Sequence, residues 1–232
     1  MIVGDLKPLD EIVSSVAGYR RILVLGCGSC VTVSLSGGDR EAAALVRELN
    51  CMVKTDGAPV SFEVGTVLRQ CEKDLVSSFC EVPPDTDAIL SLACGAGVQT
   101  VGDAFEPLPV IPALNTTFIG ASDEAGVWRE MCHGCGDCLL GVTGSICPVA
   151  RCAKSLFNGP CGGSQGGRCE IYIERPCAWA MIYFRLKKQN KLHLLHEVRM
   201  PRDWRTATAA GPRERRRTGI GGSAGETNKS AQ

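Results

Sequence analysis

The sequence lacks several features that would assign it to a common functional class. Lys plus Arg and Asp plus Glu balance at 25 each, so the chain has no excess of positive charge with which to attract nucleic acid. No run of 18 apolar residues is present, and the first residues, MIVGD, lack the basic flank and apolar core of a signal peptide. These absences predict a cytoplasmic protein that neither binds nucleic acid nor inserts into a membrane.

Histidine and recognisable acid–base patterns are also scarce. The chain has three histidines, of which only His133 lies within a cysteine motif, where histidine is more often a surface neighbour than a metal ligand. No Ser–His–Asp or paired-carboxylate arrangement stands out. Gly26 and Gly28 resemble the start of a dinucleotide fingerprint, but Cys30 and a missing third glycine break that pattern. No catalytic residue is therefore predicted.

Cysteine, by contrast, is abundant. The chain has 14 cysteines among 232 residues. In a reducing cytosol, such a set is better explained by metal ligation than by disulfides. Six of these cysteines lie in the first half of the chain, and eight lie between Cys132 and Cys177.

The first half of the chain alternates short apolar runs with amphipathic segments. The apolar runs predict strands at 22–25, 60–64, 88–93 and 109–113. The amphipathic segments predict helices at 9–16, 42–49, 71–79 and 95–105. Strands that alternate with helices imply a small α/β domain with a mainly parallel sheet, covering residues 1–127.

The second half of the chain differs in composition, and residues 128–205 are expected to form a cysteine-rich metal-binding domain. It has many glycines and few apolar runs, so metal binding is expected to supply much of its folding free energy. One helix, from about Cys177 to Asn190, carries an apolar stripe formed by Trp179, Ile182, Tyr183 and Leu186. Two interpretations are open, because this stripe suits either packing on the α/β domain or binding to a partner. Residues 206–232 are predicted to be a disordered tail.

Four cysteines of the first half share one placement. Each follows a predicted strand, at or just before the start of a helix, and the four are Cys27, Cys30, Cys71 and Cys94. In a parallel sheet such positions gather at the carboxyl edge, where open α/β folds bind their ligands. We therefore expect a four-thiolate metal site there, with a [4Fe–4S] cluster favoured over zinc. Cys51 and Cys80 are expected to be small buried residues instead.

The strongest local signal in the second half is Cys132-x2-Cys135-x2-Cys138, followed by Cys147-Pro148. The triple spacing lets three thiolates bind successive corners of a [4Fe–4S] cube, and Cys147 serves either this cluster or a neighbouring one. The remaining cysteines bring the number to eight, the ligand count of two four-thiolate sites, and they are Cys152, Cys161, Cys169 and Cys177. One or two tetrahedral zinc sites are the alternative, and iron at one site with zinc at the other also fits.

A longer stretch of this region resembles a known family. The segment CAKSLFNGPCGGSQGGRCE at 152–170, followed by Cys177-Ala-Trp179 and Ile182-Tyr183, closely resembles the methylenetetrahydrofolate reductase C-terminal domain family. Shorter motifs are similar to the N-terminal half of the same small subunit, namely CGSC at 27–30, RQCE at 69–72, LACG at 92–95 and PALNT at 112–116. The resemblance thus covers about residues 1–205.

The resemblance implies a division of labour between two proteins. In anaerobic bacteria such subunits partner a flavin-bearing barrel subunit that converts methylenetetrahydrofolate to methyltetrahydrofolate, and members are described as iron–sulfur and sometimes zinc proteins. The expected function is a non-catalytic iron–sulfur subunit of this oxidoreductase complex, which relays electrons to or from the FAD of its partner. A ferredoxin-like or other redox donor is a further expected partner. The alternative is a zinc-binding structural subunit that assembles the same complex without redox activity.

Overall fold

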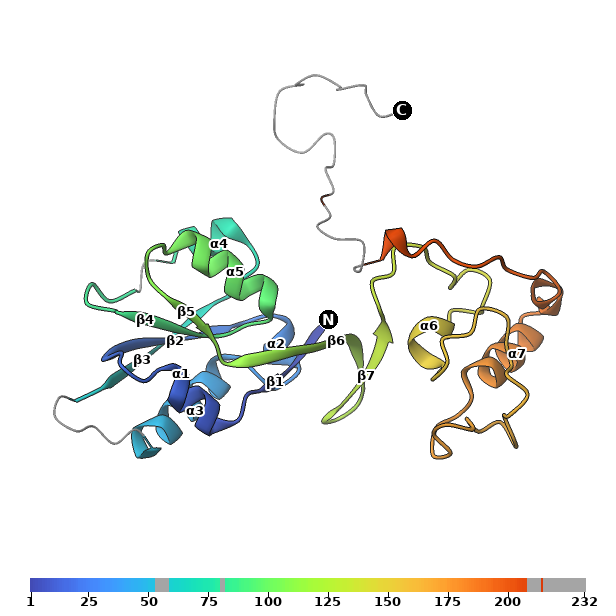
Figure 1. The fold of residues 1–232 in the computed structure, drawn as a ribbon, viewed down its shortest axis with the longest axis horizontal. Coiled ribbons are helices and arrows are strands. Elements are labelled where there is room, and N and C mark those ends of the chain that lie inside the picture. Colours follow the sequence, from blue (N-terminus) through green and yellow to red (C-terminus); the bar gives the residue numbers. More distant parts are fainter. Residues whose placement is uncertain (53–58, 80–81, 208–213, 215–232) are drawn as a thin grey trace, which may run out of the picture.

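A computed structural model of the chain describes residues 1–52, 59–79, 82–207 and 214. Figure 1 shows an α/β domain joined by a β-hairpin to a part made of short helices and long loops. Cys80 and nearly all of the predicted tail lie outside the described residues, so the expectations for them stay predictions. Within the described part of the chain, no helix combines the length and the apolar composition needed to cross a bilayer.

The α/β domain is built on a four-stranded parallel sheet in the order β3-β2-β4-β5. Its strands are β2 (Arg21–Cys27), β3 (Ser61–Val67), β4 (Ala88–Leu92) and β5 (Val110–Pro112). The two central strands, β2 and β4, are buried almost throughout, as parallel strands covered on both faces are. The predicted parallel sheet and its four strands are confirmed.

Helices cover both faces of this sheet and create two separate cores. They are α1 (Leu9–Ser15), α2 (Cys30–Val33), α3 (Asp39–Met52), α4 (Lys73–Ser77) and α5 (Gly95–Ala104). Side chains alternate along a strand, so Val24 of β2 packs with Leu45 of α3, whereas Leu23 and Leu25 pack with Val101 of α5. Each core is therefore closed by its own helices.

A second, antiparallel sheet goes beyond the prediction. Its strands are β1 (Ile2–Leu6), β6 (Leu114–Glu124) and β7 (Val127–Cys132), paired in the order β1-β6-β7. Along β6, only Leu114 and Gly120 are buried. Hydropathy does not reveal such a strand, because alternation of apolar and polar residues requires one buried face.

The cysteine-rich part has little regular structure and a core of its own. Its elements are α6 (Pro148–Arg151), α7 (Ala178–Lys188) and two short 3-10 helices, η1 (Leu192–Leu195) and η2 (Trp204–Thr206). The predicted helix is present as α7, and its residues Trp179, Ile182 and Leu186 are buried against neighbouring loops of the same part. Tyr183 stays 42% exposed. The stripe is therefore internal core, which is neither of the two interpretations drawn from the sequence.

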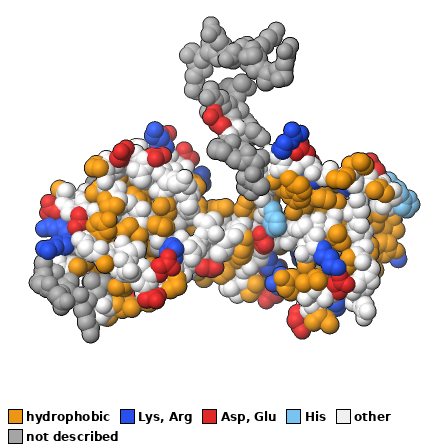
Figure 2. All heavy atoms as spheres, in the orientation of Figure 1, with side chains coloured by type: hydrophobic (Ala, Val, Ile, Leu, Met, Phe, Trp, Pro, Cys, Tyr) orange, Lys and Arg blue, Asp and Glu red, His pale blue; other side chains and the backbone are white. Residues whose placement is uncertain are grey.

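Charged side chains are mixed on the surface. On the face shown in Figure 2, Lys and Arg side chains are interspersed with Asp and Glu on both parts of the molecule. This distribution agrees with the balanced composition of the chain.

Candidate metal centres

The parallel sheet brings four cysteines to its carboxyl edge. Cys27 is the last residue of β2, Cys30 is the first of α2, Cys71 precedes α4 by two residues, and Cys94 is the N-cap of α5. All four positions follow strands that run in the same direction, so they meet at one edge of the sheet. The predicted placement after strands and before helices is present in the structure.

These thiols are close enough to influence one another's ionisation. Burial raises the pKa of the Cys27 thiol, and negative charge on Cys94 and Cys30 raises it further, while backbone N–H donors, chiefly that of Gln70, act in the opposite direction. Burial also raises the pKa of the Cys71 thiol, with Cys94 and Cys27 adding to the effect. Repulsion between several thiolates is relieved by a cation, and N–H donors to sulfur are typical around thiolate-bound metals. These four cysteines are therefore candidate ligands, and metal binding at this edge stays a prediction.

A buried glutamine holds the loop that carries Cys71. The Gln70 side chain is fully buried, and its Nε2 donates to the carbonyl oxygens of Leu25 at 2.8 Å and Gly26 at 2.9 Å. Its Oε1 accepts a hydrogen bond from the Ser91 hydroxyl at 2.6 Å. One side chain thus ties β2 and β4 to the loop after β3, and it fixes where Cys71 lies relative to Cys27.

Cys51 corrects one sequence-based expectation. It was expected to be a small buried residue, yet it is exposed near the end of α3. The buried face of α3 is formed by Ala42, Leu45 and Leu49. Cys51 comes two positions after Leu49, which on a helix is a turn of about 200° away from the buried face.

Four of the eight later cysteines line one small cavity. Its volume is about 20 Å³, and its cysteines are Cys152, Cys161, Cys169 and Cys177. Cys152 follows α6 and Cys177 is the N-cap of α7, so the ends of two helices position two of the four cysteines. Space of this size accommodates about one water-sized particle. The sequence suggested a second four-thiolate set here, and the fold brings its members together.

Polar groups contact two of the sulfur atoms around this cavity. Hydrogen bonds from the backbone N–H groups of Tyr172 and Ile171 lower the pKa of the Cys169 thiol, and the positive charge of Lys154 adds a smaller effect. The Cys161 thiol donates to Glu170 Oε1 at 3.5 Å, and Glu170 is paired with Lys154. These contacts therefore favour the thiolate form of Cys169, and metal binding in this cavity stays a prediction.

The triple cysteine motif begins at the end of β7. Cys132 is the last residue of that strand, and its sulfur accepts a hydrogen bond from the Gly134 N–H at 3.3 Å. Cys132 and Cys135 both line a larger cavity of about 490 Å³, next to β6 and η2. Cys138 is exposed, and Cys147 is the N-cap of α6, where its sulfur accepts from the Ala150 N–H at 3.5 Å. The structure thus brings two members of this motif to one cavity and places Cys138 and Cys147 apart from it.

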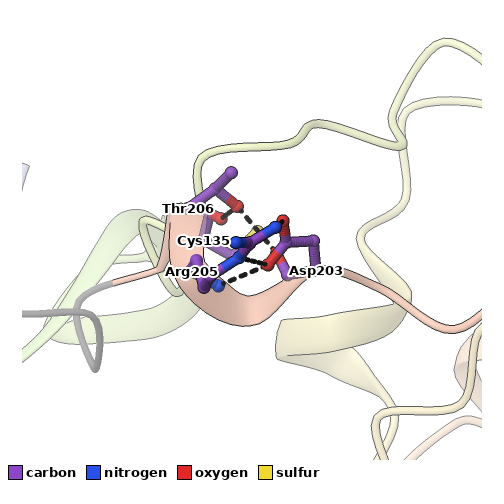
Figure 3. A network of polar contacts seen from close by, with 4 residues as sticks. All are labelled: Cys135, Asp203, Arg205 and Thr206. Atoms are coloured by element: carbon purple, nitrogen blue, oxygen red, sulfur yellow. Dashed lines mark hydrogen bonds and ion pairs between the residues drawn. The ribbon is translucent and has the colours of Figure 1, made fainter. Parts of the chain in front are cut away.

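The C-terminal segment folds back onto the loop of this motif. The Thr206 hydroxyl donates to the backbone oxygen of Cys135 at 2.9 Å, as Figure 3 shows, and Ala207 is buried. A Cβ on Gly136 would lie 2.3 Å from the Thr206 carbonyl oxygen, and Gly136 has a φ of +81°. The close approach therefore requires glycine at this position.

Strand β6 links the two groups of cysteines. The Gly95 N–H, next to Cys94, donates to Thr116 Oγ1 at 2.9 Å. Cys132 pairs with Ile119, three residues farther along the same strand. Since a strand advances about 3.4 Å per residue, the two attachment points on β6 are roughly 10 Å apart. Thr116 also lines the cavity shared by Cys132 and Cys135.

The metal geometry itself stays a prediction. Among residues 1–52, 59–79, 82–207 and 214, no group of three or more His, Cys, Asp or Glu side chains has its atoms arranged to hold a metal ion. The fold brings one group of four cysteines to the sheet edge and another group of four to one cavity, and metal binding by any of these cysteines stays a prediction.

One known protein family matches the second half of the chain. Residues 111–205 match the family described as "Methylene-tetrahydrofolate reductase C terminal". The match confirms the resemblance noted in the sequence over these residues, which include β6, β7 and all eight later cysteines. The methylenetetrahydrofolate reductase resemblance of residues 1–110 stays a prediction. No curated protein and no solved structure matches the chain.

Two residues next to the candidate centres escaped sequence reasoning. Gln70 lies within the RQCE motif, yet the role of its side chain depends on β2 and β4 carbonyls that only the fold brings near it. Arg202 lies near the end of the segment that matches the family model and contacts Cys135, which is 67 residues away in sequence. Neither contact has a local signature in the sequence.

Proposed function

We propose that this chain is the iron–sulfur electron-transfer subunit of a methylenetetrahydrofolate reductase complex. It relays electrons to or from the FAD of a flavin-containing partner subunit, which interconverts methylene- and methyltetrahydrofolate. The observation that carries this proposal is the link through β6, which attaches a four-cysteine edge and a triple cysteine motif to points roughly 10 Å apart on one strand. A relay requires more than one redox centre at short distance, whereas a scaffold needs only one structural metal.

The metals are assigned by the room and the spacing that each group of cysteines offers. The spacing Cys132-x2-Cys135-x2-Cys138 is that of [4Fe–4S] ligands. The sheet edge offers four cysteines, and burial together with neighbouring cysteines raises the pKa of two of them, Cys27 and Cys71. We assign iron–sulfur clusters to these two groups. The match of residues 111–205 to a methylenetetrahydrofolate reductase family supports the choice of partner.

A second candidate function is a zinc-stabilised assembly subunit of the same complex. One observation favours it, because the cavity between Cys152, Cys161, Cys169 and Cys177 is about 20 Å³ in volume. That space suits a single ion with four thiolates, which is the usual form of structural zinc. We assign zinc to this cavity, and the relay and scaffold functions then differ in whether the other two groups hold iron.

Metal analysis of the anaerobically purified full chain tests the proposal. We expect iron, sulfide and zinc in wild-type protein, loss of the part of the iron bound by the triple motif in Cys135→Ser, and loss of zinc with retained iron in Cys169→Ser. Cys51→Ser is the matched control, because Cys51 is an exposed cysteine outside all three groups, and it should keep every metal. A colourless wild-type protein that contains only zinc would reject the relay in favour of the scaffold.

The partner is tested with a flavin-containing methylenetetrahydrofolate reductase subunit. The dithionite-reduced, desalted chain should reduce the FAD of that subunit in an anaerobic stopped-flow experiment, and Cys135→Ser should transfer electrons far more slowly. Cys51→Ser again serves as control. Equal rates for the Cys135→Ser and wild-type proteins would show that electrons do not pass through this motif.

A further inference from the structure

Arg202 carries a buried positive charge beside Cys135. Its side chain is 3% exposed, and its Nη1 donates to the Cys135 sulfur at 2.8 Å. Its Nε and Nη2 are buried without a hydrogen-bond partner. Nη2 lies 3.3 Å from Asp137 Oδ2, but that carboxylate is 64% exposed and is not aligned as a hydrogen-bond acceptor. A guanidinium does not lose its proton in a protein, so this site requires negative charge.

Two aromatic rings hold the guanidinium in place. Its central carbon lies 5.5 Å from the centroid of the Phe157 ring and 5.6 Å from that of Trp204. Phe157 belongs to the loop between α6 and α7, and Trp204 is the first residue of η2, so the position of Arg202 is defined by two separate segments. Aromatic faces attract a cation and exclude water, and a charge interacts more strongly where water is excluded.

We propose that Arg202 is a positioning residue for the Cys132, Cys135 and Cys138 centre. It holds the Cys135 sulfur, and its fixed charge offsets part of the negative charge of a thiolate-bound cluster. This inference rests on the proposed function, because it takes the triple motif to bind a metal. The buried and unpartnered Nε and Nη2 groups fit such an anionic neighbour, since they would otherwise bury a cation with too few acceptors.

The charge has a consequence for the reduction potential. Reduction adds one negative charge to a cluster, so a fixed cation nearby stabilises the reduced form more than the oxidised form. Removal of the cation should therefore lower the midpoint potential. If Arg202 acted only through its shape, the midpoint potential would respond to changes in packing but would not depend on whether the side chain carries a charge.

The test compares three variants of the full chain, purified anaerobically. Arg202→Met removes the charge at similar length, Arg202→Lys keeps it, and Arg205→Met is the control. Arg205 is 88% exposed and is turned toward Asp203 in Figure 3, where it holds the pKa of that carboxyl at about 2. The readouts are the midpoint potential of the iron signal that Cys135→Ser abolishes, and the rate of iron loss to a chelator.

We expect Arg202→Met to shift this midpoint potential to a more negative value and to lose iron several-fold faster, with the potential largely restored in Arg202→Lys. Arg205→Met should match the wild type in both readouts. An unchanged potential and rate of iron loss in Arg202→Met would overturn the inference, and so would equal changes in the Met and Lys variants. If the wild-type protein shows no iron signal, or none that Cys135→Ser abolishes, the proposed function is rejected, and this inference is rejected with it.

Discussion

The core of the cysteine-rich part offers a direct test of coupling between packing and metal binding. Ile182 of α7 is completely buried, and Cys177, which lines the four-cysteine cavity, belongs to the same apolar core. Replacement of Ile182 with Ala should lower the free energy of unfolding by about 2–3 kcal/mol, which is in the lower half of the range measured when buried Leu or Ile is replaced with Ala. The lower half applies because several neighbours, such as Leu194 and Leu195, are only partly buried and can move into the space.

The size of this effect should depend on metal. If ligation and packing form one cooperative unit, the chelator-treated protein has already lost the structure around Ile182, and the same replacement should then cost less than about 1 kcal/mol. Ile89→Ala is the matched control, because Ile89 is equally buried but packs with Leu23, Leu25 and Val101 in a core of the α/β domain that includes none of the candidate ligands. Its cost should be the same with and without chelator.

Urea denaturation followed by two probes separates the two parts. All three tryptophans, Trp128, Trp179 and Trp204, follow the α/β domain in sequence, so fluorescence reports on the hairpin and the cysteine-rich part. Circular dichroism reports in addition on the helices of the α/β domain. An equal cost of Ile182→Ala in metal-loaded and chelator-treated protein would refute the coupling, because the core would then form without metal.

Three further predictions concern single contacts. Replacing Gln70 with Leu should lower the free energy of unfolding by about 1–3 kcal/mol, because the buried Ser91 hydroxyl loses its acceptor. A decrease below about 0.5 kcal/mol in urea denaturation would contradict this. Gly97→Ala should cost about 1–3 kcal/mol, since the added Cβ would lie 2.7 Å from a methyl group, and an unchanged melting temperature would disprove it. Trp179→Ala should lower the free energy of unfolding by about 3–5 kcal/mol, whereas Tyr183→Ala should change it by less than about 0.5 kcal/mol, because Tyr183 is 42% exposed. Equal losses in the two variants would contradict the assignment of this stripe to the core.

The parallel sheet was predictable because its two central strands, β2 and β4, are buried on both faces. A short, mostly apolar run such as that of β4, followed by a helix, is typical of a buried strand in a parallel sheet. The same topology made the gathering of Cys27 and Cys94 predictable, because strand ends of a parallel sheet meet at one edge. Gln70 was not predictable, since its partners are backbone groups of strands far away in sequence.

The cysteine-rich part was harder to predict because its core is not periodic. The helical spacing of α7 located the helix, but the residues that cover its stripe come from loops, among them Ile146 and Leu156. Apolar residues in irregular segments carry no period that reveals which face they cover. The sequence therefore left two coverings open, the α/β domain or a partner, whereas neighbouring segments of the same cysteine-rich part cover the stripe.

The distance between the two groups of cysteines is the property that sequence reasoning could not supply. The ligand candidates are visible from their spacing, but a relay depends on how near the centres lie to one another. Both groups are attached to β6, a strand that is exposed on both faces for most of its length and therefore has no hydropathy pattern that reveals it. Thr116 contacts the start of α5, and Ile119 pairs with Cys132. The spacing of these two residues along β6 therefore sets the spacing of the points at which the two groups are attached. The element that the sequence conceals is thus the one on which the proposed relay depends.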